Sequence, residues 1–401
     1  MAAPAPGASR CSAALVSARP LQGVSAASGL EICGATAYVA GDDSVFLYEL
    51  SLAAGGDPTR VARRVRLCAP RGNANGGAAN GEGAANSEER IPKKLKPDFE
   101  AMAALDVDGS PHIAVFGSAS KAGVRDGIVL IDPATGTRRE LDGGALYAAL
   151  RADTRVTGAA KLNLEAASSL GGGSHIALFQ RGNVPGGHNA VVVFKLQDFQ
   201  DHLRALGGGG GGGAAAAAAP PPAYSVVHLL LPPIDEPGGG GRAFPAGVSG
   251  ASTVSLPAAG GGAGGADEEF LLLSASYEGT LNEIDDGPVI GSRVALLPSA
   301  ALLAAAGTGG VGGVPAIDLG NLSALVLPAG GGPPVLAKIE GIAARGCSCG
   351  AGGGGGGAEG EETVVVDALG VTDPDGEASQ LMELRFEAPA ALLRAARAGA
   401  V

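Results

Sequence analysis

A short phrase recurs along the chain: an apolar residue, then Glu, then small or apolar residues. Its copies are Leu30-Glu31-Ile32, Phe99-Glu100-Ala101, Leu164-Glu165-Ala166 and Ile339-Glu340-Gly341. After a linker of variable length, each copy is followed by an apolar run that is typical of a buried β-strand. A unit of two or more strands that recurs at intervals of tens of residues indicates a solenoid or a propeller.

The spacing of the phrase separates these two architectures. Successive copies lie 69, 65 and 175 residues apart, so the last interval predicts a further unit. We locate that unit at residues 247–256, an inner strand without its Glu, followed by a second strand at 269–277. A bare propeller blade needs about 40–45 residues and a solenoid coil needs fewer. The predicted fold class is therefore all-β, a single β-propeller of five or six blades with enlarged loops.

The repeats also set the predicted domain boundaries. Residues 1–28 form an N-terminal segment, residues 29–388 the propeller and residues 389–401 a C-terminal tail. The first segment has Arg10 and Arg19 but no acidic residue, so it is either a transit peptide or a strand that closes the ring. Short helices are expected near residues 198–205 and 388–397.

Glycine and alanine are concentrated in tracts between the predicted strands. Such tracts have few apolar anchors and lose much entropy when ordered, so we interpret them as disordered loop insertions. They are residues 71–87, 207–222, 238–241, 260–266, 307–313 and 352–357. Because aromatic residues make up only 3% of the chain and Trp is absent, Val, Leu, Ile and Ala must build the core.

Charge and cysteine content limit the partners. The net charge is −12 and no basic cluster is interleaved with aromatic residues, which argues against nucleic acid. No uncharged apolar run reaches the ~18–20 residues that span a bilayer, so a membrane partner is not expected. Five scattered cysteines do not form a secreted disulfide framework. We therefore expect an intracellular monomer, cytoplasmic unless the N-terminal segment directs organelle import.

The recurring glutamates are the first candidate site. If each opens the innermost strand of its blade, the four carboxylates converge on one mouth of the central tunnel. Carboxylates at close range raise one another's pKa unless a cation compensates, and Ca²⁺ prefers such oxygen ligands. The alternative is that each Glu accepts backbone hydrogen bonds and pins the repeat. The predicted metal ligands are Glu31, Glu100, Glu165, Glu340, Asp285 and Asp286.

Two polar loops, residues 180–189 and 274–293, are a second candidate site. Loops on a rigid scaffold often carry function. Arg181 and Arg293 would hold an anionic ligand, and His188 would donate a proton. The alternative is a set of Asx turns and inter-blade ion pairs.

Several segments carry a resemblance to known propellers. They include Val39-Ala-Gly-Asp-Asp-Ser, Asp98-Phe-Glu-Ala-Met-Ala, Asn163-Leu-Glu-Ala-Ala, Arg181-Gly-Asn and Asp285-Asp-Gly-Pro-Val-Ile-Gly-Ser-Arg. These resemble an uncharacterised, mainly bacterial family of predicted β-propellers, and more loosely the phytase-like and esterase-like propellers. Calcium-dependent propeller phytases place acidic residues around the tunnel, so the resemblance adds weight to the four glutamates. The chain departs from them in lacking a dense Lys/Arg face for phosphate.

Three functions follow as hypotheses. The first is a propeller scaffold that binds a small ligand or Ca²⁺, with no other cofactor. The second is a calcium-dependent phosphoester or ester hydrolase that uses the metal ligands and the polar loops. The third is a platform for a protein partner, which needs no chemistry in the tunnel.

Overall fold

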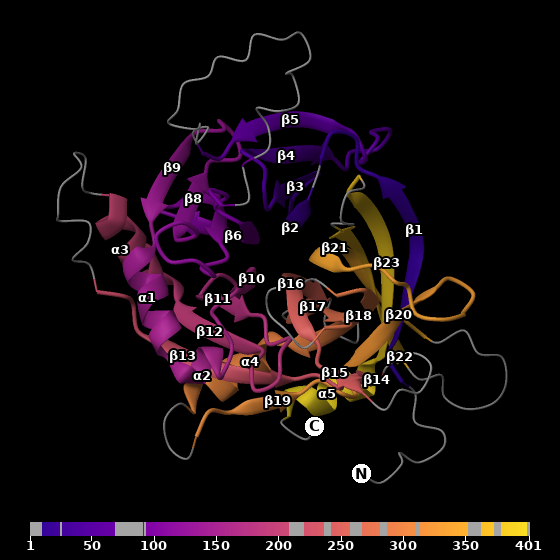
Figure 1. The fold of residues 1–401 in the computed structure, drawn as a ribbon. Coiled ribbons are helices and arrows are strands. Elements are labelled where there is room, and N and C mark those ends of the chain that lie inside the picture. The colour runs from indigo at the N-terminus through magenta and orange to yellow at the C-terminus, as the bar shows by residue number, and fades with distance from the viewer. Residues whose placement is uncertain are drawn as a thin grey trace, which may run out of the picture.

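The computed structural model describes residues 10–24, 26–68, 91, 94–207, 220–235, 242–256, 267–280, 287–308, 313–351, 362–372 and 378–398. Within these ranges the chain consists mostly of antiparallel strands that are arranged around a centre (Figure 1). The predicted Gly- and Ala-rich insertions lie largely outside the described residues.

The first two sheets are simple four-stranded meanders. One contains β2 (Ala27–Cys33), β3 (Thr36–Gly41), β4 (Phe46–Ser51) and β5 (Val61–Arg66); the next contains β6 (Phe99–Val107), β7 (Ser110–Gly117), β8 (Gly127–Ile131) and β9 (Arg138–Asp142). Asp108 and Gly109 join β6 to β7 with φ values of 57° and 77°. Two consecutive positive φ angles are typical of a tight hairpin turn that matches the strand twist.

The third sheet is another meander with one added strand. It contains β10 (Leu164–Leu170), β11 (His175–Gln180), β12 (Ala190–Lys195) and β13 (Tyr224–Leu230), and β19 (Ala316–Asp318) pairs in parallel with β13. A small ribbon of β14 (Ile234–Asp235) and β15 (Ala243–Phe244) follows.

The remaining strands form one eight-stranded sheet. Its order is β16 (Gly247–Leu256), β17 (Glu268–Glu278), β18 (Val289–Pro298), β20 (Ser323–Pro328), β1 (Ser12–Pro20), β23 (Gln380–Pro389), β22 (Glu362–Thr372) and β21 (Ile339–Ala351). The N-terminal strand β1 pairs antiparallel with β23 and parallel with β20. It therefore joins two meanders and ties the start of the chain to its last strand.

The innermost strands β2, β6, β10, β16 and β21 form a closed ring. Each packs against its two neighbours, and β21 packs against β2 to complete the circuit. Small residues make this approach close: a Cβ on Gly341 would lie 2.7 Å from the backbone nitrogen of Leu30, and one on Gly250 would lie 2.8 Å from that of Ile342. Meanders that surround a common axis with their first strands innermost give the protein a propeller-like, all-β architecture.

Helices cover parts of the periphery. They are α1 (Gly144–Ala152), α2 (Thr154–Thr157), α3 (Leu196–Gly207), α4 (Ser299–Gly307) and α5 (Ala390–Arg397). The sequence predicted helical turns at the sites of α3 and α5 but none at α1, α2 or α4. The core between the sheets is mainly aliphatic, as composition requires. None of the helices in the described ranges is long and apolar enough to cross a membrane.

Candidate functional site at the centre of the ring

Every innermost strand is bulged near its start. The register of pairing to the second strand skips one residue in each case, and the skipped residues are Ser28, Glu100, Glu165, Ser249 and Glu340. A bulge bends the strand and re-aims the side chain of the extra residue. The five skipped residues therefore hold equivalent positions around the ring, and three of the four predicted glutamates are among them.

The two serines link neighbouring strands. The Ser28 hydroxyl donates to the carbonyl oxygen of Phe99 at 2.5 Å, and the Ser249 hydroxyl donates to that of Ile339 at 2.5 Å. Both acceptors lie on an adjacent innermost strand. At these positions the polar side chain pins the ring, which is the architectural role that the sequence analysis considered for the glutamates.

Glu31 does not take the position that the sequence predicted. Ser28 occupies the bulge of β2, and Glu31 lies three residues further along the strand. Its carboxylate accepts hydrogen bonds from the backbone amides of Ile32 at 3.0 Å and Ala104 at 3.1 Å. Glu31 therefore pins β2 to β6 away from the bulges, and the prediction that it joins the other three glutamates at one mouth is wrong.

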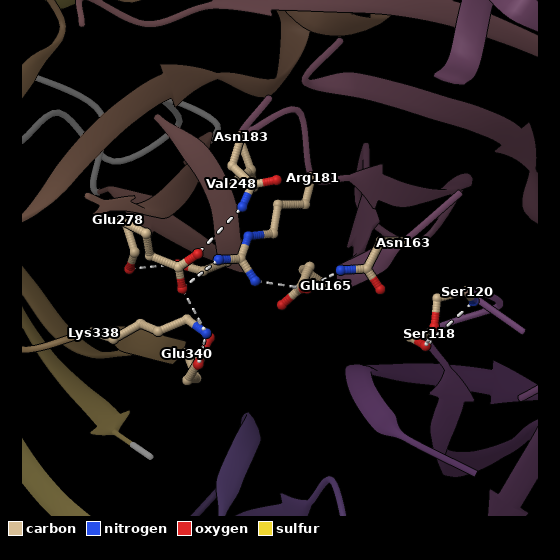
Figure 2. A network of polar contacts seen from close by, with 12 residues as sticks. Ser118, Ser120, Asn163, Glu165, Arg181, Asn183, Val248, Glu278, Lys338 and Glu340 are labelled. Atoms are coloured by element: carbon tan, nitrogen blue, oxygen red, sulfur yellow. Dashed lines mark hydrogen bonds and ion pairs between the residues drawn. The ribbon is translucent and has the colours of Figure 1, made fainter. Parts of the chain in front are cut away.

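Two of the bulge glutamates belong to a chain of alternating charges (Figure 2). Arg181 bridges Glu165 at 3.2 Å and Glu278 at 2.7 Å. Lys338 then bridges Glu278 at 2.9 Å and Glu340 at 2.7 Å. The side chains of Glu165, Arg181, Glu278 and Glu340 are all buried. This arrangement pairs three carboxylates with two cations in a desolvated setting.

The path of Arg181 depends on a glycine. Arg181 follows β11 directly, and it passes β16 where Gly247 stands. A Cβ on Gly247 would lie 2.7 Å from Cγ of Arg181. The missing side chain on β16 thus leaves the space through which the guanidinium group reaches the carboxylates.

A second group of charges surrounds Asp98. Lys96 contacts Asp42 and lies 2.9 Å from Asp98, while Arg125 also pairs with Asp98. The Ser118 hydroxyl donates to Asp98 at 2.6 Å. One carboxylate oxygen from each of Asp42, Asp98 and Glu100 can be chosen so that all three lie within 4.8 Å of one another. That spacing suits a bound cation, although the Lys96 ammonium group already contacts two of these carboxylates.

We call both groups together the central charge cluster. Its members are Asp42, Lys96, Asp98, Glu100, Arg125, Glu165, Arg181, Glu278, Lys338 and Glu340. The six carboxylates exceed the four cations by two charges. Among the described residues Glu100 makes no hydrogen bond or ion pair, and the buried Oε2 atom of Glu340 has no donor. The cluster therefore has unmet capacity for positive charge.

Burial, together with repulsion between carboxylates, raises the pKa values of Glu100, Glu340 and Asp42. For Glu100, burial and then repulsion from Glu165, Asp98, Asp42 and Glu340 place the pKa well above its ordinary value of 4.5. Burial raises the pKa of Glu340 to about 7, although Lys338 opposes the rise. Burial likewise raises the pKa of Asp42 to about 6 against the pull of Lys96.

The residues of the second predicted site have separate contacts. Arg181 is held by Glu165 and Glu278, whereas Arg293 donates to the Tyr277 hydroxyl at 2.9 Å and to the Ser323 hydroxyl at 3.2 Å. The ring of His188 stacks on His228, 4.2 Å between centroids. No contact in the described ranges joins the three predicted residues to one another. Asp285 and Asp286, predicted as metal ligands, lie outside the described residues.

Sequence reasoning assigned Arg181 to the second site and did not pair the bulge glutamates with Arg181 or Lys338. Two positional signals identify the partners. Asp98, Asn163 and Lys338 each stand two residues before a bulge glutamate, directly before the innermost strand. In four of the meanders, residues at the end of the second strand supply the rest: Asp42 follows β3, Ser118 follows β7, Arg181 follows β11 and Glu278 ends β17.

Comparison with known families identifies the chain. Residues 23–386 match a family described as a family of unknown function, DUF6929. The chain belongs to this family. A comparison with curated proteins gives no match.

Two of the solved structures that resemble this DUF6929 member share little sequence identity with it. Glutaminyl cyclase from Myxococcus xanthus has 11% identity and a TM-score of 0.40, with 94% of this chain and 97% of that chain covered. Hydrazine synthase from Kuenenia stuttgartiensis has 11% identity and a TM-score of 0.30, with 87% of this chain and 79% of that chain covered. At these values the resemblances carry no inference about function.

Proposed function

We propose that the protein is a five-bladed β-propeller that binds a hard divalent cation, with Ca²⁺ as the reference ion, in its central charge cluster. The blade count rests on the ring of five innermost strands, each with its own bulge. The observation that carries the binding proposal is the excess of carboxylates over cations in the central charge cluster. Desolvated carboxylates that lack partners favour a bound cation.

The ligand set centres on Glu100. Oxygens of Asp42, Asp98 and Glu100 are close enough together to share one ion. Ca²⁺ takes 6–8 oxygen ligands at about 2.3–2.6 Å, so water or ligand oxygens would complete the shell. Glu165 and Glu340 lie near enough to repel the Glu100 carboxylate. Their negative charges would also attract the bound cation. Glu31 has no part in this site.

Lys96 is the internal competitor of the cation. Its ammonium group pairs with both Asp42 and Asp98, so an arriving ion must displace it from at least one of them. The carboxylates raise the pKa of Lys96 above its ordinary value despite burial, so it stays charged at neutral pH. We therefore expect modest affinity in the native protein and higher affinity when this charge is removed.

Calorimetric titration of metal-stripped protein with CaCl₂ at pH 7.5 tests the proposal. We expect Glu100→Gln to weaken binding at least tenfold and Lys96→Gln to strengthen it. The matched control is Glu140→Gln, because Glu140 is an exposed glutamate on β9, the outermost strand of the sheet that contains Glu100. A second readout is the melting temperature, which a ligand raises by binding only the native state.

Two results would overturn the proposal. One is the absence of Ca²⁺ binding in both the native protein and Lys96→Gln. The other is an equal loss of affinity in Glu100→Gln and Glu140→Gln. The hydrolase alternative gains no support from the contacts, because Arg181 is engaged by two carboxylates and His188 and Arg293 have different partners.

A further inference from the structure

Two cysteines stand close together on β21, toward the end of the strand away from Glu340. They are Cys347 and Cys349, and both are free thiols. The pairing of β21 with β22 is regular here, Cys347 with Val366 and Cys349 with Val364. Residues two apart on a regular strand point to the same side. Both thiols therefore project from one face of β21.

This spacing does not suit a disulfide. A strand rises about 3.4 Å per residue, so the two Cα atoms lie about 6.8 Å apart, and the Cβ atoms are separated by a similar distance because they point the same way. A disulfide needs Cβ atoms about 3.5–4.5 Å apart and sulfurs about 2.0 Å apart. A metal ion between the sulfurs relaxes this demand, since bonds of about 2.3 Å, as in zinc thiolates, allow sulfurs up to about 4.6 Å apart. The pair is therefore spaced for a bridging ion.

The two thiols differ in access to solvent. Cys349 is exposed, whereas Cys347 is half-buried and donates to the carbonyl oxygen of Ser255 on β16 at 2.8 Å. A thiol is a weak donor, so little is lost when this hydrogen bond breaks. An ion from solvent can therefore meet Cys349 first and then take Cys347 from its carbonyl partner.

Burial keeps the pair protonated in the free protein. It raises the pKa of Cys347, and the neighbouring Cys349 and Asp267 raise it further. It also raises the pKa of Cys349, an effect that Glu362 increases and Arg394 opposes. Each thiol must lose its proton to a metal, so only an ion with a strong preference for sulfur can compete. A hard cation such as Ca²⁺ is therefore not expected here.

The number of ligands narrows the choice of ion. Among the described residues, one group of three or more His, Cys, Asp or Glu side chains is close enough to hold an ion, and it consists of Asp42, Asp98 and Glu100. The two cysteines thus form a two-sulfur site with no third ligand in the described ranges. Zinc in structural sites takes four protein ligands, and iron–sulfur clusters also need four. Cu(I) is the remaining ion that thiolates select, and it is stable with two sulfur ligands.

We propose that Cys347 and Cys349 bind one Cu(I) ion between their two sulfurs. Two S–H bonds break, two Cu–S bonds form and two protons pass to solvent. The copper stays Cu(I), so the step needs no oxidant or reductant. This copper site is independent of the central charge cluster, because its ligands are sulfur atoms and lie toward the other end of β21 from Glu340.

Competition with bicinchoninate, a coloured chelator of Cu(I), tests the site under anaerobic conditions. Reduced native protein should take one equivalent of Cu(I) from the chelator. Cys347→Ser and Cys349→Ser should each lose this uptake. The matched control, Cys11→Ser/Cys33→Ser, removes two half-buried thiols elsewhere and should keep it. The melting temperature of each variant establishes that it is folded.

Alkylation with iodoacetamide, mapped by mass spectrometry, provides a second readout. Bound Cu(I) should protect Cys347 and Cys349 and leave the reactivity of Cys11 unchanged. Added CaCl₂ should not displace the copper, and Glu100→Gln should take up copper as the native protein does. Failure of the copper site and failure of the proposed Ca²⁺ site are therefore distinguishable.

Several results would overturn the proposal. They are the absence of Cu(I) uptake by the native protein, full uptake by either single variant, and loss of uptake in the control variant. One copper ion shared between two chains would also contradict it. So would a disulfide that readily joins Cys347 to Cys349 when the copper-free protein is oxidised in air.

Discussion

The isolated carboxylate of Glu31 allows a clean test of the electrostatics of this fold. Glu31 is 8% exposed and accepts hydrogen bonds from two backbone amides, with no ion pair in the described region. Burial raises its pKa from 4.5 to about 7, against the lowering effect of the amides of Ala104 and Ile32. The substitution Glu31→Gln removes the titratable carboxyl group and keeps a side chain of similar size.

The magnitude follows from linkage. The folded protein binds the Glu31 proton more tightly than the unfolded chain does, so the contribution of this group to stability falls as pH rises from about 4.5 to about 7. A pKa difference of roughly 2.5 units corresponds to about 3 kcal/mol between the two ends of this window. Glu31→Gln loses part of the amide hydrogen bonding at every pH, but that loss does not vary with pH.

Urea unfolding of the native protein and of Glu31→Gln, measured from pH 4.5 to pH 8, tests this expectation. It shows how the difference in unfolding free energy between the two proteins changes with pH. Relative to the native protein, the variant should gain about 2–3 kcal/mol of unfolding free energy between these limits. The exposed control Glu140→Gln should show no such trend. A difference between Glu31→Gln and the native protein that stays constant with pH would refute the reasoning. Ca²⁺ affinity should be unchanged in Glu31→Gln, since Glu31 lies outside the central charge cluster.

Three further predictions concern the ring and its site. Gly341→Ala should destabilise the protein by about 1–3 kcal/mol in urea unfolding because its Cβ would meet the backbone of Leu30, whereas Gly346→Ala on the same strand faces open space and should be nearly neutral. Ca²⁺ affinity in calorimetry should fall several-fold from pH 8 to pH 5.5, because protons compete for Asp42 with its pKa of about 6; a constant affinity would contradict this site. Deletion of residues 1–20 should lower the melting temperature markedly, because β23 loses its partner β1; an unchanged melting temperature would show that this pairing contributes little.

The repeat was readable from sequence because the bulge imposes the same requirement on each innermost strand. A polar residue must follow an apolar one and precede a small one, since the neighbouring strand passes close by. Glu100, Glu165 and Glu340 satisfy this pattern and were found. The fourth-unit strand was also found without its Glu, and Ser249 holds the bulge there.

Glu31 shows why the same pattern failed in the first unit. The residues around Glu31 match the recurring phrase, but the residue at the bulge is Ser28. A search for glutamate does not find a serine at this position. Strand register depends on pairing with the next strand and on the packing of the ring, and neither is encoded in a short phrase. The pairing of cations with the carboxylates was not predicted for a related reason: Lys96, Arg125 and Arg181 lie in connections before or between strands, and only the fold brings them to the carboxylates.

The strand β1 has a consequence for how the protein is made. The Ser17 hydroxyl donates to Glu383, 366 positions later, at 2.8 Å, so β1 cannot pair with β23 until a long stretch of chain has been made. Before β23 is made, β1 can pair only with β20, so its sheet stays incomplete. Such long-range closure slows folding. Once β1 has paired with β20 and β23, neither of the two meanders that it joins can detach without breaking contacts near both ends of the chain. This arrangement favours slow, cooperative unfolding over fraying from either terminus.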